Sequence, residues 1–394
     1  MRSHKEVCLR VAILGAGVAG LATAISLTRL GMDVRVFERR EDARSLGAGV
    51  VCWPNASFVL SEFGLLGELR GVSGRVSAMR RFSQAGEELG GLDLGRLDSE
   101  MGFPSLAVLR QDLMRLLLRR ADELGVRVEF GACATGVDGE SPHGCRVRYS
   151  DGSEAEADIV IGADGRMNSV ARAYVLGDNR PVYQGCVNWL GVYDGDPGEF
   201  EAAEIHDYWG VGARFGVVPV SSNKAYWAGG FAAPEGPAAR PDELNAVFAD
   251  WPPLVKRIIS SAASRQAQCL GLYDHDPPTT WNRGRVLMIG DAAHAALPTS
   301  GQGVAQALED AWLLARELEA CPDDPTAAFA NFIPRRQKKT AGITLGARGF
   351  ASSLFCSDAE ACARRDRDAA RTDYDAMAIG MATGWSAGLP IGPA

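Results

Sequence analysis

The feature that most restricts the fold is a glycine-rich turn within residues 11–39. A short apolar run, Val11 to Leu14, precedes glycines in G-x-G-x-x-G spacing and a helix-like segment that ends at Gly31. A second apolar run, Val34 to Phe37, then leads directly to Glu38. Strand, glycine turn, helix, strand and acid in this order are typical of a βαβ unit that binds a dinucleotide.

Each glycine of this turn has its own expected role. Gly15 permits the tight turn, Gly17 lets backbone N–H groups approach a pyrophosphate, and Gly20 lets the helix pack closely on the strand. The helix N-terminus adds unpaired donors and a partial positive charge. Glu38 follows Gly20 by 18 residues, a spacing that suits an acid bonded to a ribose hydroxyl. The turn alone does not distinguish FAD from NAD(P).

Composition and charge exclude several classes of protein. A chain of 394 residues should form about two domains, and its net charge of −8 argues against nucleic acid as a partner. The sequence contains no run of 18 apolar residues, so no membrane span is expected. The nine cysteines form no C-x-x-C pair, and the five histidines show no metal-ligand spacing. We therefore expect no metal, and reduced thiols in the cytoplasm.

Two later acids also follow apolar strands. Ile159 to Ile161 leads into Gly162-Ala163-Asp164-Gly165, and Val286 to Ile289 leads into Gly290-Asp291. Open α/β sheets bind ligands at the carboxyl ends of their strands, although the Asp-Gly pair at 164–165 is also compatible with a simple turn. After Asp291, a loop leads to a long helix near Gly303, whose positive end suits a ring that becomes anionic on reduction.

The remaining segments predict a second architecture. Residues 46–51 are expected to form a glycine-rich loop, either a connector or a loop that faces the cofactor. Residues 72–106 suggest small antiparallel strands, and residues 181–274 suggest strands of a separate sheet. From Phe332 onwards the chain is expected to be helical.

Three motifs in this order resemble those of the single-component FAD-dependent aromatic hydroxylases, flavoprotein monooxygenases of the para-hydroxybenzoate hydroxylase type. They are GAGVAG with Glu38, GADG at 162–165 and GDAAHAALPTSGQG at 290–303. The middle segments YQGCVNWLG (183–191) and ARFGVVPVSSNKAYW (213–227) are similar to those of urate and salicylate hydroxylases.

The resemblance implies an α/β fold with three parts. A Rossmann-like FAD-binding domain would comprise residues 1–75, 105–180 and 275–335. A second, mainly antiparallel β-sheet substrate domain would comprise residues 76–104 and 181–274. Residues 336–394 would form a C-terminal helical segment.

The resemblance also implies roles for individual residues. Arg110 would lie near the cofactor, Asp164 would belong to a motif linked to FAD and nicotinamide binding, and Asp291 would bind the ribityl chain. Arg214 and Tyr226 would face the substrate in front of the flavin. The cofactor-binding residues expected in all are Gly15, Gly17, Val18, Ala19, Gly20, Glu38, Arg39, Gly49, Val50, Arg110, Ala134, Asp164, Asp291, Pro298, Gly301, Gln302, Gly303 and Val304.

The chemistry implied is hydroxylation of an aromatic or heteroaromatic small molecule. NADH or NADPH would reduce FAD, and O₂ would form a flavin C4a-hydroperoxide that transfers one oxygen to an electron-rich ring carbon. The chain has one G-x-G-x-x-G, so the nicotinamide is expected to bind transiently. Arg214 is the candidate that favours a phenolate or urate-like anion, and Tyr226 is the candidate that hydrogen bonds a substrate oxygen.

Other functions stay open at this point. The same chemistry could serve a Baeyer–Villiger monooxygenase or an epoxidase, and a non-oxygenating flavin reductase or an FAD-binding redox sensor would share the cofactor motifs. The G-x-S-x-G pattern at 384–388 does not indicate a hydrolase, because no Asp or His follows it. The W-x-W-x-I-P motif of flavin-dependent halogenases is absent. The sequence specifies neither the substrate, nor NADH against NADPH, nor an oligomeric state.

Overall fold

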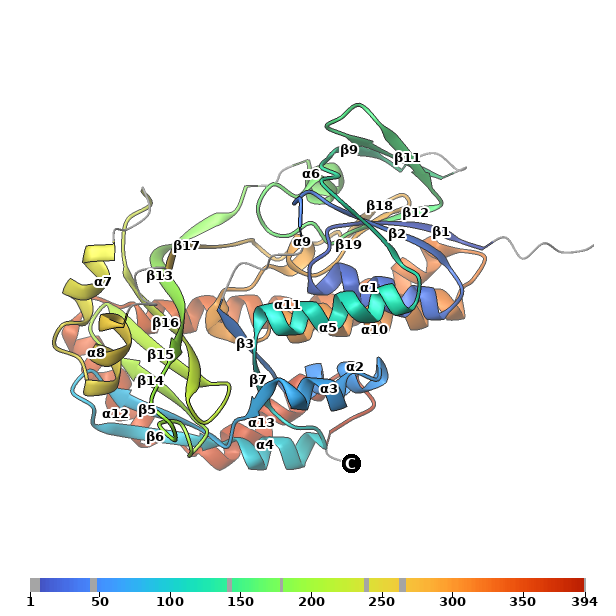
Figure 1. The fold of residues 1–394 in the computed structure, drawn as a ribbon. Helices are drawn as coiled ribbons and strands as arrows, with labels where there is room; N and C mark the ends of the chain where they lie inside the picture. Colours follow the sequence, from blue (N-terminus) through green and yellow to red (C-terminus); the bar gives the residue numbers. More distant parts are fainter. Residues whose placement is uncertain are drawn as a thin grey trace, which may run out of the picture.

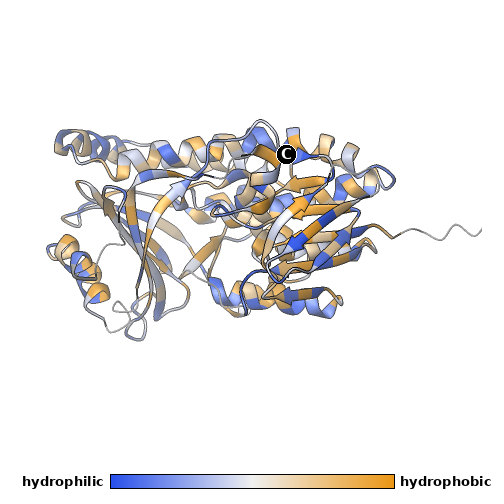
Figure 2. Cartoon of the chain, turned by 90° about the horizontal axis from the view of Figure 1, so that it is seen from above, coloured by the Kyte–Doolittle hydropathy of each residue, from blue (hydrophilic) through white to orange (hydrophobic). Residues whose placement is uncertain are grey.

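The structure, a computed structural model, describes residues 8–42, 48–139, 144–177, 180–236, 241–261 and 267–392. One half of the molecule is built on a six-stranded sheet in which only the β18–β19 pair is antiparallel. In spatial order its strands are β18 (Asn282–Arg283), β19 (Val286–Met288), β12 (Ile159–Gly162), β1 (Arg10–Leu14), β2 (Asp33–Glu38) and β8 (Arg127–Phe130). Hydrophobic residues gather along these strands (Figure 2), as a sheet covered on both faces requires.

Helices cover one side of this sheet and a smaller sheet covers the other (Figure 1). The helices are α1 (Val18–Arg29), α5 (Arg110–Glu123) and α10 (Gly303–Ala320). The opposite side carries α6 (Val170–Leu176) and an antiparallel sheet of β9 (Ala134–Asp138), β10 (Cys145–Tyr149) and β11 (Glu154–Ala157). The first βαβ unit therefore forms as predicted.

The parallel strands bring their carboxyl ends to one edge. Leu14 at the end of β1 lies opposite Phe37 of β2 and Gly162 of β12, and Gly162 lies opposite Met288 of β19. The three polar segments that follow these strands consequently meet at this edge. Glu38 and the two later strand ends therefore lie at the same edge of the sheet.

A seven-stranded sheet forms the other half of the molecule. In spatial order its strands are β17 (Gln268–Asp274), β13 (Val182–Asp194), β16 (Lys224–Ala232), β15 (Ala213–Pro219), β14 (Glu204–Trp209), β5 (Ala78–Ser83) and β6 (Glu88–Asp93). Only β14 and β5 pair in parallel, so the second sheet is mainly antiparallel, as predicted. One face packs on α7 (Pro241–Phe248) and α8 (Pro253–Ser260) through a cluster rich in buried aromatic residues.

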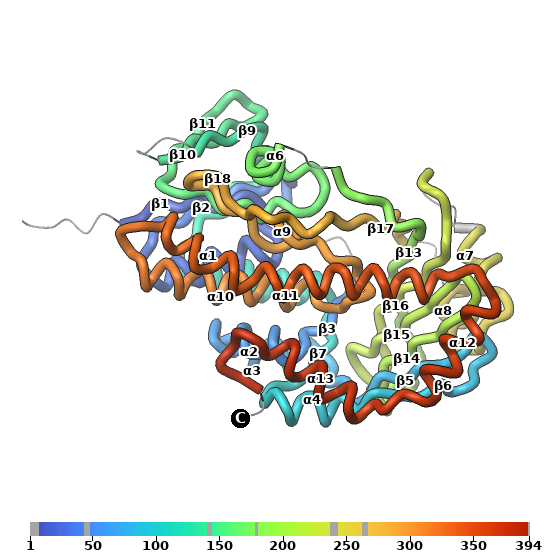
Figure 3. Tube along the Cα trace, turned by 180° about the vertical axis from the view of Figure 1, so that it is seen from behind, coloured from blue at the N-terminus to red at the C-terminus, as the bar shows by residue number. Residues whose placement is uncertain are grey.

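The C-terminal helices join the two halves. Helix α11 (Pro325–Leu354) runs beside α10 and continues to the seven-stranded sheet (Figure 3). Helices α12 (Ala359–Ala370) and α13 (Tyr374–Ser386) then return along the sheet, and α13 packs against α4 (Leu94–Met101). The predicted helical C-terminus is confirmed.

Two local predictions are wrong. Residues 49–51 belong to strand β3 (Gly49–Cys52) and do not form a loop, because β3 pairs with β7 (Leu106–Leu109); residues 46 and 47 of the predicted loop lie outside the described residues. Strand β4 (Ser73–Arg75) completes that small sheet. Within 72–106 the chain also forms helix α4, capped by Asp93, where only strands were expected. Helices α2 (Pro54–Glu62) and α3 (Leu66–Gly71) lie between β3 and β4.

Candidate active site

The glycine turn has the shape of a phosphate cradle. Gly15 has φ +99°, and a methyl group added there would collide with the Ala163 carbonyl oxygen. A methyl group on Gly20 would collide with the Gly15 carbonyl oxygen, whereas one on Gly17 would meet no atom within 4 Å. Gly17 is the N-cap of α1 and supplies no side chain to the first-turn N–H groups. These donors and the open space above Gly17 suit an anion such as a pyrophosphate.

Glu38 lies at the carboxyl end of β2 and fixes the turn. Its Oε2 accepts a hydrogen bond from Ala16 N at 2.8 Å, and its Oε1 accepts one from Arg40 N at 3.0 Å. Val18 and Ala19 occupy the first turn of α1 nearby. The carboxylate thus stands beside the glycine turn, where a ribose hydroxyl would be bound.

Two other predicted residues lie around this corner of the sheet. Arg39 is exposed, and its Nη1 lies 3.5 Å from the Met167 carbonyl oxygen, too far to fix the side chain. Ala134 begins β9, four residues after β8 ends beside Glu38. Both positions are compatible with contact to the nucleotide half of a cofactor.

Asp291 opens the short helix α9 (Asp291–His294) and carries an ion pair that the sequence did not predict. Arg166 Nη2 and Nε donate to its Oδ2 at 2.7 and 3.1 Å, while Oδ1 accepts no hydrogen bond from the described residues. Burial alone would raise the pKa of Asp291, but the charge and hydrogen bond of Arg166 hold it below its usual value. The carboxylate is therefore ionised and has one oxygen available for a hydroxyl group.

Arg110 completes this charged corner. It begins α5, its pKa is lowered by burial, and the charge of Asp291 opposes that shift. Arg166 was not predicted as a site residue. The sequence offered one sign of it, because Arg166 immediately follows the Gly162–Gly165 motif. Arg110 and Arg166 thus both lie near Asp291, and two cations there suit a phosphate-bearing ligand.

Asp164 has a structural role in addition to its predicted role in a cofactor-binding motif. Its Oδ2 accepts hydrogen bonds from Val170 N and Ala171 N, and its Oδ1 accepts one from Ser169 Oγ at 2.5 Å. These bonds satisfy the N-terminus of α6. Burial raises the pKa of Asp164, and the hydrogen bonds oppose that shift. The acid thus stiffens the loop that carries Arg166.

The loop that precedes α10 faces open space. In this loop Pro298, Gly301 and Gly303 are exposed, and Val304 is half-buried. Pro298 begins the short 3₁₀ helix η2 (Pro298–Ser300). Trp53 Nε1 donates to the Gly301 carbonyl oxygen at 2.8 Å and holds this loop beside β3, where Gly49 and Val50 lie. Trp53, which sequence reasoning did not single out, therefore positions this loop.

Gln302 anchors the same loop through buried hydrogen bonds. It is 1% exposed, and its Oε1 accepts hydrogen bonds from Asn55 Nδ2 at 2.9 Å and Gln306 Nε2 at 3.0 Å. Its Nε2 is buried without a partner among the described residues. Gln302 is also the N-cap of α10, and its side chain does not cap the helix. The uncapped helix end therefore offers donors to a ligand on the open side of the loop.

Arg214 lies on the face of the seven-stranded sheet opposite α7 and α8. Its Nε donates to Asp207 Oδ1 at 2.6 Å, and Trp209 Nε1 donates to Asp207 Oδ2 at 2.9 Å. A methyl group added at Gly216 would lie 2.9 Å from Arg214 Nη2, so the guanidinium group extends over Gly216. Its two Nη atoms donate to none of the described residues and can bind an anion.

Tyr226 lies on the same face and reaches strand β3. Val218 and Tyr226 are register partners, two residues along from the Gly216–Ala228 pair. The Tyr226 ring occupies the space that a side chain at Gly49 would need. Burial raises the pKa of Tyr226, so its hydroxyl remains a donor. The structure thus brings Arg214, Tyr226 and β3 together.

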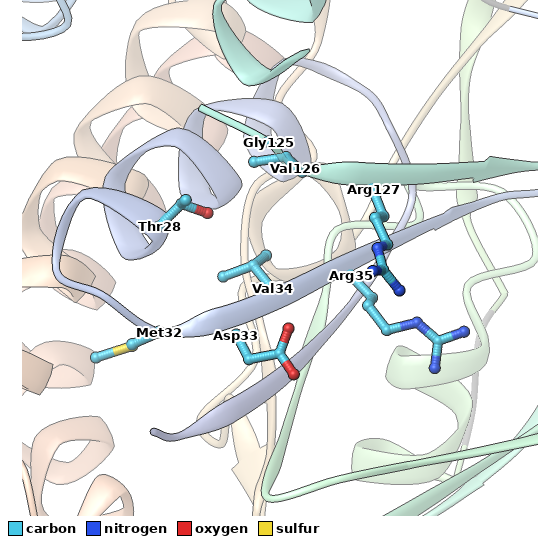
Figure 4. A pocket seen from close by; sticks show the side chains of 8 residues that line it. All are labelled: Thr28, Met32, Asp33, Val34, Arg35, Gly125, Val126 and Arg127. Carbon is cyan, nitrogen blue, oxygen red and sulfur yellow. The ribbon is translucent and has the colours of Figure 1, made fainter. Parts of the chain in front are cut away.

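A hollow elsewhere on the molecule does not belong to this site. It has a volume of 410 Å³ and lies at the amino ends of β2 and β8, lined by Asp33, Arg35 and Arg127 among others (Figure 4). The glycine turn lies at the opposite, carboxyl ends of these strands. Within the described residues, no cluster of potential metal ligands occurs and no helix is long and apolar enough to cross a membrane.

Comparison with known proteins agrees with this geometry. Residues 9–323 match the family described as "FAD binding domain". The chain is 35% identical to 3-amino-4-hydroxybenzoate 2-monooxygenase of Streptomyces cremeus, over 97% of this chain and 96% of that protein. It is 31% identical to the FAD-dependent urate hydroxylase of Mycolicibacterium vanbaalenii, over 90% and 91% of the two chains.

A solved structure supports the same assignment. The crystal structure of Klebsiella pneumoniae HpxO complexed with FAD and uric acid is similar with a TM-score of 0.87 and 28% identity, covering 96% of this chain and 97% of the other. The family match spans most of the chain, and the relatives are aligned along nearly their full length. The chain therefore belongs to the family of FAD-dependent aromatic monooxygenases that share this FAD-binding domain.

Proposed function

We propose that this monooxygenase hydroxylates a small aromatic or heteroaromatic anion whose negative charge is held by Arg214. The observation that carries the proposal is the position of Arg214 on the face of the seven-stranded sheet opposite α7 and α8. Its Nε is fixed to Asp207, and both Nη atoms are unpaired among the described residues. A bidentate guanidinium group suits a carboxylate or an enolate-like ring anion.

The residues at the carboxyl edge of the six-stranded sheet fit FAD. The space above Gly17, the uncapped start of α1 and the free Oδ1 of Asp291 accommodate a pyrophosphate and a polyhydroxyl chain. When bound, this cofactor would accept two electrons from NADH or NADPH and would then activate O₂. The loop from Pro298 to Val304 and the start of α10 would lie beside its ring.

The residues around Arg214 would orient the substrate and exclude water. Asp207 fixes the guanidinium group, and Tyr226 would donate a hydrogen bond to the substrate from a hydroxyl that stays protonated at neutral pH. Leu190, Val192 and Val218 are apolar residues on the same face. An orienting cation inside an apolar enclosure holds an electron-rich ring in place and limits the loss of activated oxygen to water.

The relatives favour hydroxylation over the other oxygenations. Their names include 3-amino-4-hydroxybenzoate 2-monooxygenase, FAD-dependent urate hydroxylase and 6-hydroxynicotinate 3-monooxygenase. Each named substrate is an acidic, electron-rich ring, which matches the charge of Arg214. We infer the same class for this chain. The nine free cysteines favour a reducing compartment such as the cytoplasm.

Ligand binding to the oxidised holoenzyme tests the role of Arg214. Flavin difference spectra would give the Kd of 3-amino-4-hydroxybenzoate, urate and 6-hydroxynicotinate. We expect Arg214→Ala to raise the Kd of the preferred ligand about 10- to 100-fold, because a charge-assisted hydrogen bond is lost. It should also divert turnover of NAD(P)H towards free hydrogen peroxide.

A matched variant separates this effect from general damage. Arg80 lies on β5 of the same sheet and pairs with Glu204 and Glu88. Arg80→Ala should leave both Kd and coupling unchanged. Unchanged ligand affinity and full coupling in Arg214→Ala would remove Arg214 from the substrate site.

A further inference from the structure

We propose that Asn188 is a further substrate-binding residue that selects rings with a polar substituent on the side away from the anionic group. The inference rests on the proposed function, since it places the anion at Arg214. Asn188 lies in β13 and is 6% exposed, yet its side-chain amide makes no hydrogen bond to any of the described residues. Neither polar atom of the amide is fully enclosed, so a ligand or water can reach the amide and satisfy it.

The strand register directs this amide to the Arg214 side of the sheet. Asn188 lies opposite Gly230 of β16, and Gly230 lies opposite Arg214 of β15. Residues in one row across a sheet point to the same face. Asn188 and Arg214 therefore share a face, with a residue that lacks a side chain between them.

Gly216 and Gly230 place no side chain of their own between the two polar groups. A methyl group added at Gly230 would lie 2.7 Å from Asn188 Oδ1, whereas one at Gly216 would lie 2.9 Å from Arg214 Nη2. Gly216 pairs with Ala228, and Gly230 lies two residues further along β16. Gly216 and Gly230 are therefore diagonal neighbours, ~8 Å apart. A ring that bridges Asn188 and Arg214 would therefore lie over Ala228.

The surroundings of the amide are apolar, which gives it selective power. Leu190 lies two residues along β13 on the same face, and a Phe355 ring carbon lies 3.3 Å from the added methyl position at Gly230. An amide both donates and accepts hydrogen bonds, so it can bind a ring hydroxyl, amino group or oxo group. A ring that lacks such a group would leave the amide unpaired and bind less tightly.

Binding to the oxidised holoenzyme tests the inference without turnover. Flavin difference spectra would compare benzoate with 3-hydroxybenzoate and 4-hydroxybenzoate, which differ only in the polar substituent. We expect the wild type to bind one hydroxybenzoate about tenfold more tightly than benzoate. Asn188→Leu, which keeps the branched shape at a larger volume and removes the hydrogen bonds, should reduce that preference to about twofold or less while benzoate affinity changes little.

Three further variants make the result decisive. Asn223→Ala changes an exposed asparagine in the β15–β16 turn of the same sheet and should keep the full preference. Asn188→Ser, which restores a hydrogen-bonding group, should regain part of it, and FAD content would verify that each variant is folded. A preference that survives in Asn188→Leu, or a wild type without any preference, would overturn the assignment. Unchanged benzoate affinity in Arg214→Ala would instead contradict the proposed function.

Discussion

Three glycines of one turn have different surroundings, although a single motif predicts all three. Gly15 and Gly20 are confined by backbone atoms, so the fold itself requires the absence of a side chain. Gly17 has an ordinary φ of −75° and open space around it. Its lack of a side chain therefore serves the ligand and not the fold.

This difference predicts opposite phenotypes for two similar substitutions. Gly17→Ala should change the free energy of unfolding of the apoprotein by less than about 0.5 kcal/mol, yet weaken FAD binding at least about tenfold. Gly20→Ala should destabilise the apoprotein by about 1–3 kcal/mol through overpacking. Urea unfolding and FAD titration measure both quantities. Wild-type FAD affinity in Gly17→Ala would contradict the cradle.

Asp291 provides a second test at the scale of one residue. Asp291→Ala should weaken FAD binding by about 1 kcal/mol or more, because a hydrogen bond to a ribityl hydroxyl is lost and Arg166 is left unpaired. Asp291→Asn keeps an acceptor at the same place and should lose less. Fluorescence titration of FAD distinguishes the two variants, and equal affinity of Asp291→Ala and wild type would remove Asp291 from the cofactor site.

At the scale of elements, a buried polar network holds α9 and α10 against α11. Arg336 of α11 pairs with Glu309 and Asp310 of α10, and its Nε lies 2.7 Å from Asp310 Oδ1. His294 Nε2 and Asp310 Oδ2 are 2.6 Å apart, and Gly290 N donates to the same oxygen at 2.8 Å. Asp310 is fully buried, so removing one partner leaves a buried charge uncompensated.

The network predicts a dependence of stability on pH. Burial alone would raise the pKa of Asp310, but His294 and Arg336 lower it to about 2. The folded state thus holds this proton less tightly than the unfolded chain, whose carboxyl titrates near 4. The corresponding stabilisation, on the order of 2 kcal/mol, is present above pH ~4 and disappears as the pH falls towards ~2.

Urea unfolding of the apoprotein from pH 6 to pH 3 checks this expectation. The wild type should lose stability more steeply than Asp310→Asn, which cannot titrate at this position. Glu87→Gln, at an exposed acid, should follow the wild type. Identical pH slopes for wild type and Asp310→Asn would show that the buried pair does not carry the effect.

The elements that the sequence predicted share a strong local signal. The first βαβ unit and the strand before Asp291 have apolar runs bounded by glycines or acids. Strand β3 was predicted as a loop because its glycines mask a strand that depends on pairing with the distant β7. Helix α4 was missed because its only local start signal is the Asp93 cap.

At the scale of the whole molecule, the site lies between two sheets that the sequence could describe only separately. Motif spacing predicted Glu38 and Asp291 at one sheet edge, and resemblance suggested Arg214 and Tyr226. Tertiary pairing decides the rest: Arg166 becomes the partner of Asp291, and Asn188 shares a face with Arg214 only through the β13–β16–β15 register. Such contacts join residues far apart in the chain and have no local pattern.

The most direct test of the central claim is the fate of molecular oxygen in a single turnover. The holoenzyme, reduced by NAD(P)H, would be mixed with ¹⁸O₂ and each acidic aromatic ligand, followed by mass spectrometry of the ring product. We expect one ¹⁸O atom in the product of the preferred ligand. In Arg214→Ala we expect that oxygen to be recovered as hydrogen peroxide. Oxidation of NAD(P)H with all oxygen recovered as hydrogen peroxide for every ligand would contradict the central claim.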